Sequence, residues 1–255
     1  MTRVGVSGAA GRMGKLVAET IAYATGFELT ALYDPNAGGT SIAGIEVSET
    51  PEVMVDVDVD VVVEFTNPDV VMGNLRRWHT LGRHAVVGTS GFGEERLTEL
   101  ESFWETGAGN CLVVPNFSIG AVVMMRIAEI AAPHFDAAEV IEMHHDRKAD
   151  APSGTAIATA QRIAKVAAQR REVDSKELVA GARGADVDGV PVHSVRLPGL
   201  VAHQAVMLGG MGETLTIRHD TTDRQAFMPG VVLALRKVAD LPAPVTVGLD
   251  PLLGL

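Results

Sequence analysis

Three glycines between an apolar run and a helical pattern constrain the fold of this chain more than any other feature. They stand at Gly8, Gly11 and Gly14, directly after the β-type run of residues 3–7. Beyond them, apolar side chains recur at helical spacing through residues 13–21. Between a strand and a helix, such glycines permit a tight turn, a close approach of the backbone to a pyrophosphate, and close packing of the helix. The pattern therefore predicts a dinucleotide-binding unit.

An acidic residue, Asp34, ends the next apolar run and lies twenty residues beyond Gly14. At this distance we expect its carboxylate to bind a ribose hydroxyl of the dinucleotide, although a solvated turn acid before Pro35 is the alternative. A carboxylate here repels a 2′-phosphate, which favours NADH over NADPH. The guanidinium of Arg12, at the start of the helix, is suited to bind that phosphate. We therefore expect a preference for NADH with some activity with NADPH.

Short apolar runs alternate with helical patterns through the first half of the chain. They cover residues 3–7, 29–33, 59–65, 84–87 and 112–114. This rhythm predicts an α/β fold with a Rossmann-type, doubly wound parallel sheet. Ligands bind outside the carboxyl ends of such strands, which is where residues 66–68, 88–90 and 115–117 fall. Judged by residue type alone, these groups are also consistent with ordinary turns.

The pattern changes after a predicted helix at residues 119–132. Longer β-type runs follow at residues 139–143, 190–196, 204–208 and 213–219. They predict a second, α+β domain with a mixed or antiparallel sheet, a helix over residues 154–171 and a glycine-rich loop at 181–185. A helical pattern from Pro229 onward should return to the first domain. We therefore expect residues 1–118 and 228–255 to bind the dinucleotide, and residues 119–227 to bind substrate and form an oligomer.

Residues 142–156 combine proton donors with an anion-binding turn. His144, His145 and Lys148 can supply protons near neutral pH. The segment 152–155 then opens a helical pattern, whose first N–H groups are suited to hold a carboxylate. Taken singly, the histidines are more typical of buried, hydrogen-bonded side chains and Lys148 of a solvated cation. No third histidine or cysteine stands at ligand spacing, so we expect no zinc site.

Five segments together carry a family resemblance: the loop 8–14, Glu64-Phe65-Thr66, residues 88–92, residues 115–120, and the signature 144–155. With them the chain resembles the bacterial 4-hydroxy-tetrahydrodipicolinate reductases, also called dihydrodipicolinate reductases, of the diaminopimelate route to lysine. The resemblance implies NAD(P)H-dependent reduction of 4-hydroxy-tetrahydrodipicolinate to tetrahydrodipicolinate with loss of water. It covers nearly the whole length of the chain.

The resemblance also implies roles for individual residues. His144 would be the proton donor or acceptor and Lys148 the proton donor, while His145, Gly154 and Thr155 would contact the dicarboxylate substrate. The implied cofactor contacts are Gly8, Ala9, Ala10, Gly11, Arg12, Met13, Asp34, Gly88, Thr89, Ser90, Val114, Pro115, Asn116 and Phe117. Relatives that accept NADPH often carry an arginine after the ribose acid, and Pro35 at this position weakens the case for NADPH. A homotetramer joined through sheets of the second domain is usual in the family.

Two other functions stay open on the sequence. One is a related nicotinamide enzyme, such as aspartate or homoserine dehydrogenase, and the other is a non-catalytic dinucleotide sensor. A sensor has no use for His144, His145 and Lys148 ahead of a carboxylate-binding turn. Arg183, in the glycine-rich loop, is a further candidate to add positive charge to the dicarboxylate site.

Composition limits the partners of the protein. A net charge of −11 argues against a nucleic acid or an anionic membrane as partner. The uncharged window 106–125 is interrupted by glycine, asparagine and proline, which favours strand, loop and helix over a membrane span. The N-terminus enters its first strand directly, so we expect a cytoplasmic protein. Cys111 stands in an apolar run and should be buried, and the acids at positions 56, 58 and 60 predict one solvated strand face over 53–61.

Overall fold

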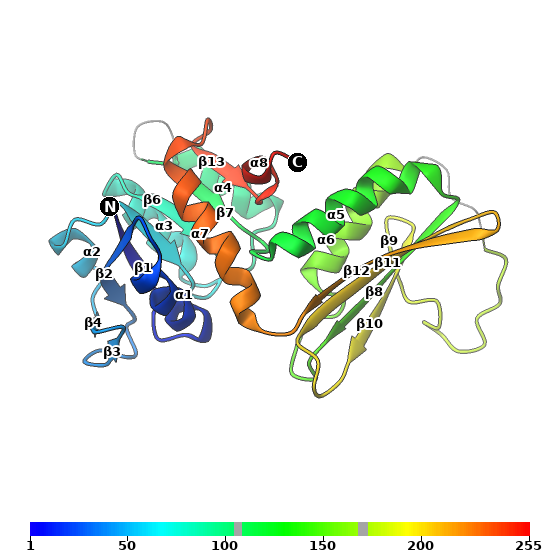
Figure 1. Cartoon of the computed structure of the whole chain (residues 1–255), viewed down its shortest axis with the longest axis horizontal. Coiled ribbons are helices and arrows are strands. Elements are labelled where there is room, and N and C mark those ends of the chain that lie inside the picture. The colour runs from blue at the N-terminus through cyan, green and yellow to red at the C-terminus, as the bar shows by residue number, and fades with distance from the viewer. Residues whose placement is uncertain (105–108, 168–172) are drawn as a thin grey trace. The chain divides into compact units, whose positions relative to one another are not determined.

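The computed structural model describes residues 1–104, 109–167 and 173–255, and the chain divides into two compact units. The first unit contains Met1–Ser118 and Phe227–Gly254, and the second contains Ile119–Ala226 with Leu255 (Figure 1). The assignment of cofactor to one unit and of substrate and oligomerisation to the other stays a prediction.

The first unit is built on a mostly parallel sheet. Its strands are β1 (Thr2–Ser7), β2 (Phe27–Tyr33), β3 (Ser41–Ile42), β4 (Ile45–Ser48), β5 (Val61–Glu64), β6 (His84–Val87), β7 (Cys111–Val113) and β13 (Val245–Val247). Their order in the sheet is β13-β7-β6-β5-β1-β2-β4-β3. Among the described strands of this sheet, only β3 pairs in the antiparallel sense, with β4. The chain leaves β1 first toward β2 and later returns to its other side at β5, which confirms the predicted doubly wound sheet.

Helices connect these strands. They are α1 (Arg12–Tyr23), α2 (Val53–Asp56), α3 (Val71–Thr80), α4 (Glu94–Phe103), α7 (Met228–Lys237) and α8 (Asp250–Leu253), with a short 3₁₀ turn at Val238–Asp240. Another 3₁₀ turn, Arg224–Phe227, stands where the chain passes from the second unit to the first. Because parallel strands are covered on both faces, their side chains form a near-continuous apolar core. Cys111 is fully buried in that core, as its apolar context predicts.

The strand face expected over residues 53–61 is wrong. Residues 53–56 form the short helix α2, and β5 begins only at Val61. Met54 of this helix is fully buried and belongs to the core cluster of the first unit, a tertiary contact that the alternating pattern does not reveal. Asp58 and Asp60 instead form ion pairs with Arg3, which no local pattern specifies.

The second unit is a five-stranded mixed sheet with two helices. The strands are β8 (Ala137–His144), β9 (Ala185–Val187), β10 (Val190–Arg196), β11 (Ala202–Gly210) and β12 (Glu213–Thr221), in the order β12-β11-β8-β10-β9. Strand β10 runs parallel to β8, whereas the other neighbours are antiparallel. This confirms the predicted second α+β fold with a mixed sheet.

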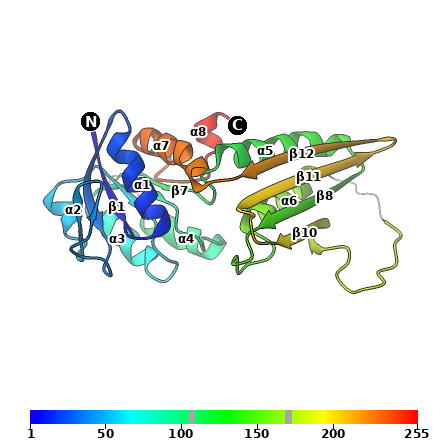
Figure 2. The same cartoon turned by 60° about the horizontal axis from the view of Figure 1, so that its bottom comes forward.

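Helices α5 (Ile119–Ala131) and α6 (Gly154–Val166) pack on one face of this sheet (Figures 1 and 2), and a 3₁₀ turn at Ala132–His134 follows α5. Ala128, Ala160 and Ile163 meet Val140 and Val206 of the sheet in one buried cluster. The predicted end of α6 at residue 171 lies outside the described residues. Within the described ranges, no helix is both long and apolar enough to cross a membrane.

Candidate active site

The glycine turn between β1 and α1 lies in close contact with the first turn of the helix. Gly8 has a positive φ of 77°, which favours glycine. A Cβ atom at Gly14 would lie 2.0 Å from the carbonyl oxygen of Gly8, so the helix approaches the turn too closely for any side chain there. The first turn of α1 carries no acidic residue. Its unpaired N–H groups therefore fit a phosphate group.

Asp34 follows β2 and lies against this turn. Its Oδ2 atom accepts a hydrogen bond from the N–H of Ala10 at 3.1 Å, and its Oδ1 atom accepts one from the N–H of Asn36 at 3.1 Å. The carboxylate thus stands beside the glycine turn, where a ribose ligand is expected in this fold. Arg12 begins α1 and is exposed, so its guanidinium is accessible at the same edge of the sheet.

The remaining predicted cofactor residues follow the neighbouring strands β6 and β7. A Cβ atom at Gly88 would lie 2.2 Å from the ring of Phe65, whose centroid is 5.5 Å from that of Phe117. The hydroxyl of Thr89 accepts a hydrogen bond from the N–H of Thr66 at 2.9 Å and lies 3.2 Å from the carbonyl of Glu64. These contacts link the ends of β5, β6 and β7 into one edge.

Other members of this predicted set also lie at that edge. They are Ala9 and Met13 beside the glycine turn, Ser90 after β6, and Val114, Pro115 and Asn116 after β7. Val114 donates its N–H to the carbonyl of Val87, and Asn116 Oδ1 accepts from the N–H of Ser118. The carboxyl edge of the first unit therefore brings the predicted cofactor residues together.

In the second unit, strand β8 ends at His144, and a buried carboxylate holds that side chain. His144 Nδ1 lies 2.5 Å from Oε2 of Glu142, which is fully buried. Both Nη atoms of Arg196 bind the same carboxylate at 2.8 Å, one to each oxygen. The N–H of Ser153 donates to Glu142 Oε1 at 3.2 Å. One carboxylate thus connects β8, β10 and the start of α6.

The charges in this cluster follow from these contacts. Burial raises the pKa of Glu142, but hydrogen bonds from Arg196, Ser194 and His144 outweigh burial and hold that pKa below its usual range. The carboxylate is therefore ionised at neutral pH and accepts hydrogen bonds only. Burial lowers the pKa of His144, although Glu142 opposes this shift. A neutral His144 that donates its Nδ1–H to Glu142 keeps an unprotonated Nε2 atom.

The loop after His144 carries Lys148 and turns back on itself. Lys148 donates its N–H to the carbonyl of His145, and its Nζ atom lies 2.6 and 2.8 Å from the two carboxylate oxygens of Asp150. Arg196 also binds the carbonyl of Asp150 at 2.6 Å. The same guanidinium therefore contacts both the Glu142–His144 pair and the loop of Lys148.

Helix α6 begins directly after this loop. Ser153 is its N-cap, and the serine hydroxyl accepts a hydrogen bond from the N–H of Ala156 at 3.2 Å. The first two residues of the helix are Gly154 and Thr155, and Gly154 is exposed. The Nδ1 atom of His145 is buried and has no hydrogen-bond partner among the described residues. This arrangement is suited to bind an anion such as a carboxylate.

Sequence reasoning missed Arg196 and the linking role of Glu142. Arg196 lies 54 positions after Glu142, and only the parallel pairing of β10 with β8 sets Arg196 opposite His144. The signal present in the sequence is a glutamate two positions before a histidine in a strand, which puts both side chains on one face.

Arg183 forms an ion pair with Glu139, five residues before His144 on β8. This ion pair does not support the role of Arg183 at the dicarboxylate site, and that role stays a prediction.

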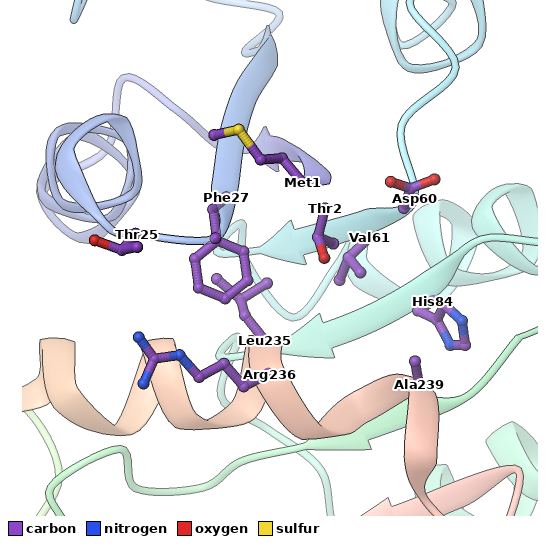
Figure 3. Close-up of a pocket in the computed structure, with 11 residues that line it drawn as sticks. Met1, Thr2, Thr25, Phe27, Asp60, Val61, His84, Leu235, Arg236 and Ala239 are labelled. Atoms are coloured by element: carbon purple, nitrogen blue, oxygen red, sulfur yellow. The ribbon is translucent and has the colours of Figure 1, made fainter.

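A cavity of about 730 Å³ in the first unit lies elsewhere. Figure 3 shows that its walls include Thr2, Phe27, Val61 and His84, which stand at or near the amino ends of their strands, together with Arg236 of α7. Ligands of doubly wound sheets bind at the opposite, carboxyl edge. Within the described part of the chain, no group of three or more metal-ligating side chains is present.

A doubly wound sheet with this glycine turn and an acid at its edge, Asp34, is typical of the class of NAD(P)-dependent oxidoreductases. Two family models match the chain: the N-terminus of dihydrodipicolinate reductase over residues 2–117 and its C-terminus over residues 120–253. The chain therefore belongs to the dihydrodipicolinate reductase family. Enzymes of this oxidoreductase class use a nicotinamide cofactor.

Individual relatives agree with this assignment. The 4-hydroxy-tetrahydrodipicolinate reductases of Mycolicibacterium vanbaalenii and Nocardia farcinica are 47% and 49% identical to this protein, over 99% of each chain. A dipicolinate-bound dihydrodipicolinate reductase from Paenisporosarcina sp. TG-14 is 38% identical, with a TM-score of 0.86 over 98% of this chain and 99% of that chain. An aspartate dehydrogenase from Thermotoga maritima is 15% identical with a TM-score of 0.52, which indicates a shared fold alone.

Proposed function

We propose that this protein reduces 4-hydroxy-tetrahydrodipicolinate to tetrahydrodipicolinate with loss of water, in the diaminopimelate route to lysine. The observation that carries the proposal is the cluster at the end of β8, where His144, Lys148 and the first turn of α6 follow one another around a buried carboxylate. The relatives that carry this name match the chain from end to end, which supports the same reaction here.

The reaction takes up one hydride and one proton and releases one water. A bound reduced nicotinamide supplies the hydride. The departing hydroxyl of the substrate needs a proton to leave as water, and the ammonium group of Lys148 is the proposed donor. His144 is the proposed second proton-transfer group, because its Nε2 atom is left free to accept and return a proton.

The substrate is a dicarboxylate, and we assign one of its carboxylates to the start of α6. The N–H groups of Gly154 and Thr155 stand in the first turn of the helix, where the helix dipole favours negative charge. His145 adds a buried ring nitrogen that is without a partner among the described residues. These contacts would bind and orient the substrate beside His144 and Lys148.

We assign the cofactor to the carboxyl edge of the first unit, with NADH preferred. Asp34 supports this preference, since its carboxylate lies beside the glycine turn and would repel a 2′-phosphate. The exposed guanidinium of Arg12 supports residual activity with NADPH.

We further propose, from the family resemblance, a cytoplasmic homotetramer joined through sheets of the second unit. Light scattering coupled to size exclusion measures that oligomeric state.

The test of the reaction is a coupled assay. The preceding synthase generates the substrate in place from pyruvate and aspartate semialdehyde, and the loss of reduced-nicotinamide absorbance is followed with NADH and with NADPH. We expect rapid oxidation that depends on the synthase and is faster with NADH. Oxidation of homoserine or aspartate by the same protein would indicate a different dehydrogenase. Binding of NADH without any oxidation would indicate a dinucleotide sensor.

A further inference from the structure

Glu142 accepts hydrogen bonds from three residues of the candidate site, but it takes no part in the proposed proton transfers. It is fully buried, yet it carries a negative charge in the interior of the second unit. An isolated buried carboxylate is costly, so a fold that keeps one must compensate it with hydrogen bonds. Here Arg196, Ser153 and His144 supply them.

The contact with His144 restricts the chemistry of the imidazole. An ionised carboxylate accepts hydrogen bonds and cannot donate one, so the nitrogen that faces Glu142 must carry the proton. That nitrogen is Nδ1, at 2.5 Å from Oε2. The other nitrogen, Nε2, is then the only ring atom that can take up a proton. A carboxylate in this relation to a histidine fixes both its tautomer and the direction of its ring.

The contact with Arg196 extends this control to the loop that follows. The guanidinium binds Glu142 through both Nη atoms and binds the carbonyl of Asp150 through one of them. Asp150 in turn holds the ammonium group of Lys148 at 2.6 Å. A lysine side chain at position 196 could not make this forked contact, because its ammonium group is a single point of charge.

We propose that Glu142 is the positioning residue of the site: it holds His144 in the Nδ1–H tautomer and, through Arg196, fixes the loop that carries Lys148. The proposal rests on the proposed function for the catalytic roles of His144 and Lys148. The tautomer and the loop geometry can be measured without any reaction, so the two proposals can fail separately.

The first experiment measures the tautomer in the full-length protein. Histidine is labelled with ¹⁵N, long-range ¹H–¹⁵N spectra are recorded near pH 8, and the His144 signals are identified by their loss in His144→Gln. We expect the Nδ1–H tautomer in the wild type. In Glu142→Gln the new amide group can donate to Nδ1, so the proton should move toward Nε2. An Nε2–H tautomer in the wild type, or an unchanged tautomer in the variant, overturns the proposal.

The same chain offers a matched control. Glu139 lies on the same strand, and its Oε2 atom is 2.8 Å from Nε2 of His193, in a histidine–carboxylate pair outside the site. Glu139→Gln should change the signals of His193 and leave those of His144 and the turnover as they are. If both glutamate variants disturb His144 equally, the effect is a general loss of charge on β8 and the proposal is wrong.

Titration of His144 provides a second readout that a purely structural role would not move. The charged groups that face its ring are Glu142, which raises its pKa, and Lys148 and Arg196, which lower it. Removal of the Glu142 charge should therefore move the midpoint of the His144 signals to lower pH. The acidic limb of the pH–rate profile should move in the same direction. A midpoint that stays in place contradicts direct control of His144 by Glu142.

Turnover completes the test. We expect Glu142→Gln, with a folded circular dichroism spectrum, to lower kcat by about 10²- to 10⁴-fold, as loss of the correct tautomer does in serine proteases, with KM for NADH unchanged. Unchanged kcat overturns the proposal. If this variant does not fold, Arg196→Lys replaces it. In Arg196→Lys, kcat should fall while His144 keeps its Nδ1–H tautomer. An unchanged kcat would overturn the proposal that Glu142 fixes the Lys148 loop through Arg196. An inactive coupled assay with a responsive His144 tautomer would refute the reaction and leave the positioning role intact.

Discussion

At the scale of single residues, the proposed function gives His144 and Lys148 different proton transfers although they are four positions apart. Burial lowers the pKa of His144, so its ring is neutral at neutral pH and can accept a proton. Lys148 is a cation beside the carboxylate of Asp150 and can donate one. A reaction that releases water needs a donor at the departing oxygen, and Lys148 is the donor that we propose.

Replacement of Lys148 tests this division of roles. We expect Lys148→Ala to lower kcat by about two to four orders of magnitude, because the departing hydroxyl loses its proton donor. The affinity for NADH, measured by calorimetry, should be retained. Lys165→Ala is the matched control, since Lys165 is exposed in the last turn of α6. Full turnover of Lys148→Ala would remove Lys148 from the chemistry.

Replacement of Asp34 tests the choice of cofactor. The wild type should use NADH with a higher kcat/KM than NADPH. We expect Asp34→Ser to raise the NADPH-to-NADH ratio of kcat/KM by about 10- to 100-fold, because it removes a charge that repels the 2′-phosphate. Asp56→Ser, an exposed acid of α2, should leave the ratio unchanged. A wild-type ratio well above one would contradict the assigned preference.

At the scale of elements, the junction of β1 with α1 depends on a close backbone contact. Helix α1 can start where it does because Gly14 has no Cβ atom, and a methyl group there would lie 2.0 Å from the carbonyl oxygen of Gly8. This contact places the first turn of the helix over the glycine turn. The same residue thus serves packing and the predicted phosphate site.

Two glycine-to-alanine variants separate packing from helix propensity. Gly14→Ala should lower the free energy of unfolding by about 1–3 kcal/mol through overpacking, and should weaken NADH binding. Gly73→Ala, in α3 with open space around its Cβ position, should raise that free energy by about 0.5–1 kcal/mol. Urea unfolding and calorimetry measure both effects. Equal changes in the two variants would show that the Gly8–Gly14 contact has no special cost.

At the scale of the whole molecule, partly buried histidines make stability depend on pH. Burial lowers the pKa of His84, His144 and His219 below the ordinary value of 6.5. The unfolded chain therefore binds more protons than the folded chain just below pH 6.5, and stability falls as the pH falls through the lowered folded pKa values. Burial raises the pKa of Glu64 and acts in the opposite direction, so single variants are needed to isolate each histidine.

His84 is suited to this measurement because it belongs to the first unit, whereas the candidate proton-transfer residues belong to the second. Its Nδ1 atom accepts the N–H of Asn110 at 2.9 Å, and an asparagine oxygen can take that place. In His84→Asn, the fall in unfolding free energy between about pH 7.5 and 5.5 should be smaller than in the wild type. Exposed His134→Asn is the control. Identical pH slopes for wild type and His84→Asn would show that burial of His84 does not destabilise the folded chain in acid.

The sequence by itself determined the two kinds of sheet and the segments that carry each candidate site. Periodicity and the three glycines are local signals, because strand, turn and helix preferences act over a few residues. For the same reason the signature 144–155 could be read as a proton-transfer segment followed by a helix start. The edge formed by Gly88, Thr89 and Phe117 follows from the general rule for parallel sheets.

Tertiary structure alone decided what surrounds those residues. Arg196 reaches Glu142 because β10 pairs with β8, and residues 53–56 form α2, whose Met54 packs in the core of the first unit, in place of the expected strand. Both outcomes depend on contacts between segments far apart in sequence, and no short pattern encodes their register. Hydrogen bonds then keep Glu142 ionised against the effect of burial, and burial lowers the pKa of His144; both effects exist only in the folded chain.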